Sequence, residues 1–194
     1  MADLNGRVAL VTGASSGIGR AVALRLAQDG AEIFAVAEGP EAALRDAAAR
    51  CGGRSTWRAI DLAEPGAAER MVAECLATLG RVDILVNNAG VGTAVPASRE
   101  TPEQFRSVLE INLEGCYWMA QAAARVMPAG SSIINVSSVL GIVTAGLPQA
   151  AYAASKAGLL GLTRDLAAQW TSRKGIRVNA VAPGFFASEM TDAY

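Results

Sequence analysis

Tyr152 and Lys156 lie four residues apart in an alanine-rich stretch of a chain that contains no histidine. On a helix, residues i and i+4 share one face, so the phenol and the ammonium would be neighbours. A free phenol, with a pKa of about 10, exchanges protons poorly near neutral pH, and a nearby cation lowers that pKa. One interpretation of the pair is therefore a proton-transfer site, and the spacing alone does not decide it. The simpler interpretation is a solvated helix whose aromatic side chain rests on a neighbour.

A glycine-rich turn, TGASSGIG, directly follows the apolar run at 8–11. Such a turn lets the backbone approach phosphate oxygens, and the N-terminus of the next helix attracts their charge. The spacing is neither G-x-G-x-x-G nor a P-loop, which needs Gly-Lys-Ser/Thr. At the first strand of an alternating chain it still predicts a dinucleotide site. The residues assigned to this site are Gly13, Ser15, Ser16, Gly17, Ile18 and Gly19.

Polar residues also follow two later strand patterns. Asp61 and Leu62 come after one of them, and the Asp61 carboxylate either accepts a hydrogen bond from an adenine amino group or caps the next helix. Asn88, Ala89 and Gly90 follow the other, where they either wall a ribose pocket or form an Asx-type turn. Both pairs of alternatives stay open at this point.

Glu38 bears on the choice between NAD and NADP. A carboxylate at the end of the second strand hydrogen-bonds the adenosine 2′-hydroxyl, whereas an arginine there neutralises a 2′-phosphate. The stretch VAEG at 36–39 has no neighbouring Lys or Arg, and Ser16 in the glycine turn adds no positive charge. The sequence therefore favours NAD over NADP.

The elements that must position these residues alternate between strand and helix patterns. Strands are predicted at 8–11, 33–37, 56–60, 84–86, 132–136 and 176–181. Helices are predicted at 17–29, 40–50, from 65 onward, at 101–127 and at 149–172. This order predicts a parallel sheet with helices on both faces and right-handed crossovers. Ligands of such sheets bind beyond the carboxyl ends of the strands, where the residues singled out above are expected.

The composition narrows the class of protein. The chain has 194 residues, of which 52% are hydrophobic and 18% charged, with a net charge of -1. It suits one folded domain and makes nucleic acid an improbable partner. No apolar run approaches the roughly 20 residues of a membrane span, and the three cysteines lack metal-type spacing. We expect a cytoplasmic protein without a membrane segment or a bound metal.

Several motifs occur in a characteristic order: TGxxxGxG at 12–19, NNAG at 87–90, Ser138, the Tyr152/Lys156 pair, and Pro183 with Gly184. Together, over nearly the whole chain, they resemble the classical short-chain dehydrogenase/reductase (SDR) family, particularly its 3-ketoacyl reductase and gluconate-type dehydrogenase members. The resemblance implies a Rossmann-type doubly wound parallel sheet in three αβα layers, with strand order 3-2-1-4-5-6-7. It also implies a nicotinamide cofactor and a homo-tetramer or dimer.

The resemblance also implies catalytic roles. Tyr152 would exchange a proton with the substrate oxygen, and Ser138 would orient and polarise that oxygen. Lys156 would lower the phenol pKa and hydrogen-bond the nicotinamide ribose. Asn112 would hold a water that links Lys156 to solvent, and its simpler interpretation is an ordinary polar residue in a helix.

Toward the end of the chain, Pro183 and Gly184 resemble the turn that faces the nicotinamide carboxamide, and Ser188 matches a family threonine that contacts it. The sequence runs to Tyr194, whereas members of the family run several tens of residues further. Residues 1–194 are thus expected to form a single NAD(P)-binding domain without the family's C-terminal substrate-covering segment and last strand.

These observations favour an oxidoreductase that interconverts a small secondary alcohol (a CH–OH group) and a ketone. The alternative is a catalytically silent NAD(P)-binding sensor or scaffold. An epimerase or dehydratase of the extended branch would need a different glycine spacing and a longer chain. A serine hydrolase is excluded because Ser138 has no histidine to activate it.

Overall fold

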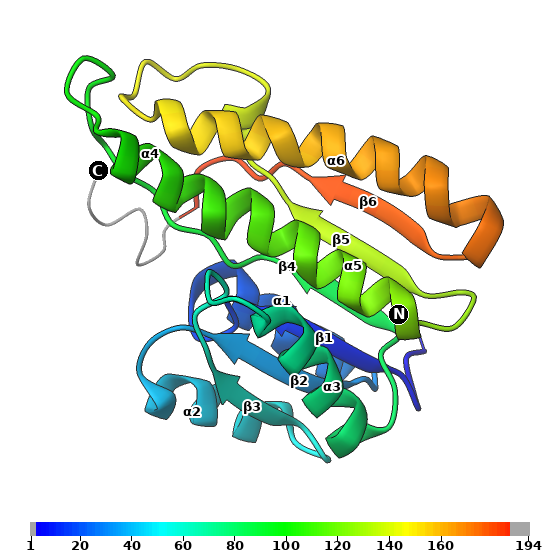
Figure 1. Ribbon diagram of the computed structural model, residues 1–194. Coiled ribbons are helices and arrows are strands. Elements are labelled where there is room, and N and C mark those ends of the chain that lie inside the picture. Colours follow the sequence, from blue (N-terminus) through cyan, green and yellow to red (C-terminus); the bar gives the residue numbers. More distant parts are fainter. Residues whose placement is uncertain (1–2, 187–194) are drawn as a thin grey trace.

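The computed structural model describes residues 3–186, so Ser188 lies outside the described residues. Its centre is one parallel sheet of six strands (Figure 1). The strands are β1 (Val8–Thr12), β2 (Glu32–Ala37), β3 (Thr56–Ala59), β4 (Ile84–Asn87), β5 (Ser132–Val136) and β6 (Arg177–Val181). Their spatial order is β3-β2-β1-β4-β5-β6, as predicted for the described part of the chain. The order reverses beside β1, which brings the glycine turn to the switch point of the sheet.

Helices cover both faces of the sheet. They are α1 (Gly17–Gln28), α2 (Glu41–Cys51), α3 (Ala67–Leu79), α4 (Pro102–Leu109), α5 (Cys116–Val126) and α6 (Ala150–Lys174). Helices α3, α5 and α6 contribute to one buried cluster, and α1 and α2 contribute to another. The three-layer αβα arrangement is therefore confirmed. Within residues 3–186, no helix is both long and apolar enough to span a membrane.

Strand β1 shows why a buried strand of this sheet has an unbroken run of apolar residues in its sequence. Val8 and Leu10 face the cluster under α3, α5 and α6, whereas Ala9 and Val11 face the cluster under α1 and α2. Side chains alternate between the two faces of a strand, and here both faces are covered. All five residues of β1 are buried as a result.

The predicted continuous helix at 101–127 is wrong in one respect, because a π-helix at Glu110–Gly115 separates α4 from α5. The predicted start is correct. The Thr101 hydroxyl accepts from the Gln104 backbone N–H at 3.3 Å, and the Gln104 side chain accepts from the Thr101 N–H at 2.9 Å. This is a capping box with Pro102 in the first turn. Asn112 lies inside the π-helix, a distortion that often occurs at functional sites.

Two other helix ends differ from the predictions by about two residues. Helix α3 begins at Ala67 rather than at Pro65, because Gly66 at its N-cap has a left-handed backbone with φ of 75°. Helix α6 continues to Lys174 and ends at Gly175, which is also left-handed with φ of 69°. Glycine adopts this conformation without a steric penalty, so these two positions fix the ends.

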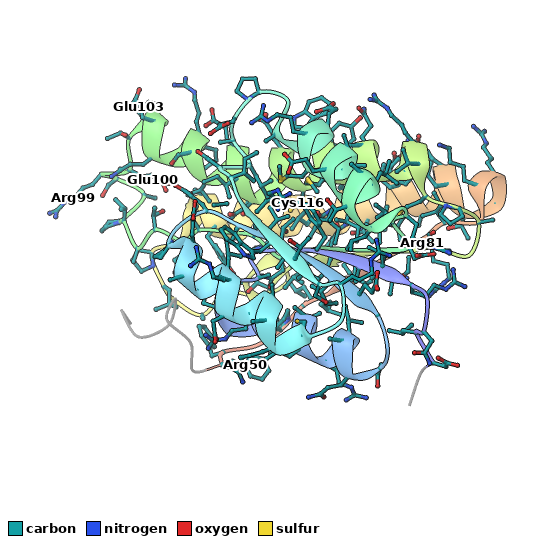
Figure 2. The ribbon with its side chains drawn as sticks, turned by 90° about the horizontal axis from the view of Figure 1, so that it is seen from below. Arg50, Arg81, Arg99, Glu100, Glu103 and Cys116 are labelled. Atoms are coloured by element: carbon teal, nitrogen blue, oxygen red, sulfur yellow. The ribbon has the colours of Figure 1, made fainter. Side chains whose placement is uncertain are left out.

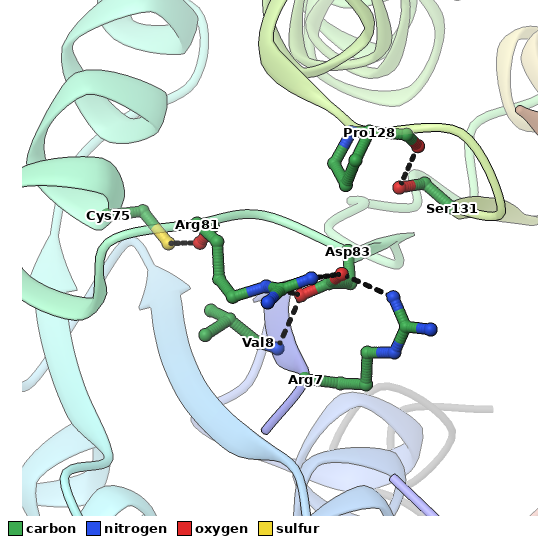
Figure 3. Close-up of polar contacts among 7 residues, drawn as sticks. All are labelled: Arg7, Val8, Cys75, Arg81, Asp83, Pro128 and Ser131. Atoms are coloured by element: carbon green, nitrogen blue, oxygen red, sulfur yellow. Dashed lines mark hydrogen bonds and ion pairs between the residues drawn. The ribbon is translucent and has the colours of Figure 1, made fainter. Parts of the chain in front are cut away.

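Asp83 connects the amino ends of β1 and β4, and the glycine turn lies at the carboxyl end of β1. Figure 3 shows the polar contacts of Asp83. It is only 2% exposed. Its carboxylate accepts hydrogen bonds from Arg7 at 2.8 Å, from Arg81 at 2.7 Å through each oxygen, and from the Val8 N–H at 3.0 Å. Burial raises the pKa of Asp83, but these hydrogen bonds outweigh burial and lower the pKa below its usual value.

We expect Asp83→Asn to lower the free energy of unfolding by about 3 kcal/mol, because hydrogen bonds to charged groups contribute about 1.5–3 kcal/mol each. Since the folded-state pKa is lowered, the wild-type contribution is fully present above the unfolded pKa of about 4 and is lost as the pH falls through the folded pKa. Urea denaturation across that pH range measures both effects.

Asp46→Asn is the matched control, since Asp46 forms only an exposed ion pair with Arg50 at 3.8 Å. It is expected to change stability by about 0.5 kcal/mol or less. If Asp83→Asn changed stability as little as Asp46→Asn, the hydrogen bonds of Asp83 would not hold β1 and β4 together.

Candidate active site

A single cavity of about 310 Å³ brings most of the predicted site residues together. It is lined by loops that follow the strands, at the end of the sheet where ligands of such folds bind. The predicted residues that line it are Gly13, Ser15, Ser16, Gly17, Ile18, Glu38, Asp61, Leu62, Asn88, Ala89, Gly90, Ser138, Tyr152, Lys156, Pro183 and Gly184. Gly19 and Asn112 are buried outside the lining.

The glycine turn is a backbone cradle that has no room for side chains. Gly13 and Gly17 have positive φ angles of 65° and 48°. A Cβ on Gly13 would lie 2.6 Å from Nδ2 of Asn88, and a Cβ on Gly19 would lie 2.1 Å from the Gly13 carbonyl oxygen. Glycine is required at 13 by conformation and contact, and at 19 by contact alone.

Asn88 and Thr12 hold this turn in place. The Asn88 amide donates to the carbonyl oxygens of Thr12 at 3.0 Å and of Gly13 at 3.2 Å. The Thr12 hydroxyl accepts from the backbone N–H groups of Asn88 and Ala89, both at 3.0 Å. The side chain of Asn88 thus fastens the segment after β4 to the glycine turn. Thr12 belongs to the sequence motif, but the sequence did not predict that its hydroxyl accepts these two hydrogen bonds.

The N-terminus of α1 fits a phosphate group. Ser16 is the N-cap with an extended backbone, its side chain makes no capping hydrogen bond, and the first turn carries no acidic residue. The first N–H groups of a helix lack intrahelical acceptors and lie at the positive end of the helix dipole. Together with the glycine cradle, this end of the cavity suits the diphosphate of a dinucleotide.

Glu38 and Asp61 lie at the ends of β2 and β3, on the same side of the cavity. Glu38 is exposed. The Asp61 carboxylate accepts a hydrogen bond from the Ala63 N–H at 2.8 Å. It does not cap the next helix, which was the alternative left open, because α3 begins at Ala67 with Gly66 as its N-cap. Asp61 still lines the cavity, so the hydrogen bond from the Ala63 N–H orients the carboxylate without removing it from the site.

Tyr152 and Lys156 lie on α6, and both line the cavity. Lys156 is only 3% exposed. Its Nζ donates to the Val136 carbonyl oxygen at 2.9 Å and lies 5.5 Å from the centre of the Tyr152 ring. Burial lowers the pKa of Lys156, while the hydrogen bond to a carbonyl, a group that accepts but cannot donate, favours the protonated amine.

Cys116 is a buried thiol that interacts electrostatically with Lys156 (Figure 2). Burial raises the pKa of its thiol to about 11, so the thiol stays neutral near pH 7. It therefore supplies no negative charge that would offset the ammonium of Lys156.

Ser138 precedes a short 3-10 helix, Val139–Gly141, and lines the cavity. Its Oγ accepts a hydrogen bond from the Leu140 N–H at 3.1 Å. Because this bond uses the oxygen as an acceptor, the hydroxyl hydrogen remains able to donate. A hydroxyl arranged in this way suits polarisation of a carbonyl oxygen.

Two further residues, which the sequence did not single out for this role, attach the Ser138 segment to α6. The Ser137 hydroxyl donates to the Lys156 carbonyl oxygen at 2.7 Å. A Cβ on Gly141 would lie 2.7 Å from the Lys156 carbonyl carbon and 2.8 Å from the Ala157 nitrogen. Ser138 thus lies between two contacts with the backbone of the helix that carries Tyr152. Neither contact has a sequence signal, because both depend on how a loop meets a helix.

Asn112 joins three parts of the site from behind the cavity. Its amide nitrogen donates to the Val91 carbonyl at 2.9 Å and to the Ser155 hydroxyl at 3.1 Å, and its oxygen accepts from the Val91 N–H at 2.8 Å. A Cβ on Gly90 would lie 3.2 Å from the Asn112 oxygen and 3.3 Å from Nζ of Lys156. The π-helix therefore directs Asn112 toward the Lys156 region. Its predicted role in holding a water stays a prediction.

Other residues that line the cavity were not expected from the sequence. Most are apolar loop residues, which carry no signal of chemistry on their own. They include Val91, Val139, Leu140, Phe185 and Phe186, together with the buried polar residue Gln149.

Comparison with known proteins shows the family to which the chain belongs. The model of the short chain dehydrogenase family matches residues 7–194. The chain belongs to this family, as the motifs predicted, and so to a class of NAD(P)-dependent dehydrogenases and reductases.

Two curated relatives show the range of activities nearby. The chain is 39% identical to the 3-oxoacyl-[acyl-carrier-protein] reductase FabG of Escherichia coli, over 98% of this chain and 78% of that protein. It is 42% identical to the D-threitol dehydrogenase of Mycolicibacterium smegmatis, over 96% of this chain and 73% of that protein. One relative is named for an acyl substrate and the other for a polyol.

Solved structures agree in fold. A short chain dehydrogenase from Burkholderia cenocepacia in complex with NADP has a TM-score of 0.94 and 36% identity, covering 97% of this chain and 78% of that one. A protein from Beutenbergia cavernae described as an NAD(P)-dependent gluconate 5-dehydrogenase, with NADP bound at low occupancy, has a TM-score of 0.90 and 38% identity. The latter match covers 98% of this chain and 77% of that one. The predicted fold class is confirmed, and so is the resemblance to 3-ketoacyl reductase and gluconate-type members.

Proposed function

We propose that the protein transfers a hydride between a nicotinamide dinucleotide and a secondary alcohol or ketone, with Tyr152 as the acid and base. The observation that carries this proposal is the position of the buried Lys156 amine, 5.5 Å from the centre of the Tyr152 ring, in the cavity that the glycine turn also lines. A buried cation beside a phenol favours the phenolate and so brings the proton transfer within reach of neutral pH.

In the reduction, the π bond of the carbonyl breaks, the carbon gains a hydride and the oxygen gains the Tyr152 proton. A bound reduced nicotinamide would supply the hydride and be oxidised by two electrons. The glycine turn and the α1 N-terminus would hold the diphosphate, and Lys156 would reach the nicotinamide ribose. Ser138 donates to the carbonyl oxygen and holds it near the phenol. In the oxidation, the phenolate takes the alcohol proton.

Turnover of a panel of ketones with NADH and NADPH tests the proposal. The expected result is consumption of reduced cofactor that depends on both the ketone and the protein. Binding of the cofactor without turnover of any ketone or alcohol would instead favour the alternative, a silent NAD(P)-binding sensor or scaffold. Light scattering on the same sample tests the proposed homo-tetramer against a dimer.

The preference for NAD is a separate proposal that rests on Glu38 alone. Its exposed carboxylate at the end of β2 would repel a 2′-phosphate. Two similar structures hold NADP, which does not support this preference. Titration with both cofactors decides the point: tighter binding of NADP would make the prediction from Glu38 wrong.

We expect Glu38→Gln to strengthen NADP binding about tenfold, because it removes the negative charge and keeps the shape, while NAD binding weakens slightly. Fluorescence titration of the two reduced cofactors measures this ratio. Glu41→Gln, three residues on and in an exposed ion pair with Arg45 at 3.9 Å, is the control. An unchanged ratio for Glu38→Gln would mean that the carboxylate does not face the 2′ position.

A further inference from the structure

The end of the cavity that holds Ser138 and Tyr152 opens onto apolar side chains. Val91 and Leu140 line the cavity there, as does Phe185, which is 61% exposed. The loop after β5 leaves the cavity at Leu140 and returns to it at Gln149. We call the following six residues the apolar rim: Val91, Leu140, Ile142, Val143, Leu147 and Phe185.

Between Leu140 and Gln149, the loop after β5 exposes large aliphatic side chains. Ile142 is 64% exposed and Val143 is 55% exposed, although both are large aliphatic residues. The loops after β4 and β5 both lie at the carboxyl end of the sheet (Figure 1). Exposed apolar side chains that gather at the mouth of a cavity mark a surface that binds apolar groups.

Charge is distributed unevenly along the cavity. Of the described residues that line it, the acidic ones are Glu38 and Asp61, at the ends of β2 and β3, and the cationic one is Lys156. The Nζ of Lys156 donates a hydrogen bond to the Val136 carbonyl, and the proposal above assigns its other donors to the nicotinamide ribose. Arg99, in the loop after β4, is exposed and extends away from the body of the molecule (Figure 2). Among the described residues, a substrate carboxylate at the rim would therefore lose water without gaining a cation.

Polar side chains at this end are few. Ser138 and Tyr152 are assigned to the reacting oxygen, and the Ser137 hydroxyl donates to the Lys156 carbonyl oxygen. Gln149 is a further polar side chain of the described lining near the rim. Gln149 is 7% exposed. A polyol would place several hydroxyl groups against aliphatic and aromatic side chains, and each hydroxyl without a partner weakens binding.

We propose that the apolar rim selects uncharged ketones and secondary alcohols that carry a hydrocarbon chain, and disfavours carboxylates and polyols of the same size. This inference rests on the oxidoreductase function proposed above and specifies its substrate class. The rim does not alter the reaction, which remains reduction of the carbonyl by hydride from the bound dinucleotide and a proton from Tyr152. A hydrocarbon chain on the substrate is removed from water when it binds at the rim, which favours binding. Charged groups and hydroxyl groups lose their hydration there, which weakens binding.

The test compares kcat/KM for matched ketones, followed as consumption of reduced cofactor. Butanone is paired with erythrulose, which has the same carbon skeleton with hydroxyl groups, and methyl levulinate is paired with levulinate. We expect the apolar or neutral member of each pair to be favoured about tenfold or more. Lengthening a linear methyl ketone is expected to raise kcat/KM about fourfold per methylene until the rim is filled.

A matched pair of variants locates the effect. Val91→Thr exchanges a methyl group for a hydroxyl at the rim, where Val91 is 36% exposed. Val126→Thr makes the same change at the end of α5, where Val126 is 39% exposed. We expect Val91→Thr to reduce the gain per methylene and the preference for butanone, and Val126→Thr to leave both at wild-type values. Cofactor titration confirms that each variant is folded.

The outcomes separate the two proposals. If erythrulose or levulinate were turned over as well as its matched partner, the apolar selectivity would be refuted and the oxidoreductase function would stand. If Val126→Thr and Val91→Thr had the same effect, the rim would not be the source of the selectivity. If no ketone were reduced although the cofactor bound, both proposals would fall together.

Discussion

Tyr152→Phe is expected to lower kcat about a thousandfold while changing the cofactor dissociation constant by no more than about threefold. The substitution removes one oxygen atom and keeps the ring, so the face of α6 and its contact with Lys156 are retained. Acid–base groups supply about 10²–10⁴-fold in rate, and this chain has no histidine to take over the role. Single-turnover rates with a saturating reduced cofactor measure the chemical step directly.

Tyr117→Phe is the matched control for this experiment. Tyr117 lies on α5, where its hydroxyl accepts from the Gln121 amide at 3.3 Å and its ring meets Trp118 edge-on. The same loss of a hydroxyl there is expected to leave kcat at the wild-type value. Undiminished turnover by Tyr152→Phe would show that another group moves the proton, and the electrostatic argument from Lys156 would then fail.

Much of the fold could be predicted because its signals are local. The buried strands are apolar runs, and the glycine turn follows the first of them, so the sheet and the phosphate cradle are visible in the sequence. The i, i+4 spacing of Tyr152 and Lys156 is also local, since one helix carries both residues. Residue type and spacing along one element were enough in these cases.

Other features depend on contacts between distant segments, and the sequence carries no signal for them. The residues at 101–127 were predicted as one continuous helix, so the π-helix that turns Asn112 toward Val91 and Ser155 was missed. The pairing of Asp83 with Arg7 bridges residues 76 positions apart. In the sequence, the apolar rim resembles an ordinary loop. Its place beside the cavity is known only from the structure, in which Leu140 and Gln149 line the same cavity. Periodicity predicts which face is buried, but it does not predict which loop meets which helix.

Gly141 is the position where such a hidden contact is expected to have the largest effect on the chemistry. It ends the 3-10 helix that follows Ser138, and a Cβ there would meet backbone atoms of Lys156 and Ala157 at 2.7–2.9 Å. Its φ is not in the left-handed region, so alanine meets no conformational penalty and the cost is steric. Because the opposing atoms belong to a helix backbone, the loop must move, and Ser138 moves with it.

We therefore expect Gly141→Ala to lower kcat about a hundredfold, since a displacement of about 1 Å in a catalytic group has an effect of this size. The free energy of unfolding is expected to fall by about 1–3 kcal/mol, as for other overpacked sites. Gly161→Ala, on α6, is the control. A Cβ at this position would have only the Arg164 side chain nearby, at 3.8 Å. That change is expected to stabilise α6 by about 0.5–1 kcal/mol and to leave kcat unchanged.

The rates are measured well below the melting temperature of each variant, so that loss of folded protein does not lower kcat. Cofactor affinity supplies the second reading: the glycine cradle lies at α1, remote in the chain from Gly141, and the dissociation constant is expected to stay within about threefold of the wild type. Wild-type kcat in Gly141→Ala would mean that the loop yields without moving Ser138, and the contact with α6 would then have no part in setting the distance between Ser138 and Tyr152. Normal stability with a hundredfold lower kcat would assign the contact to positioning alone.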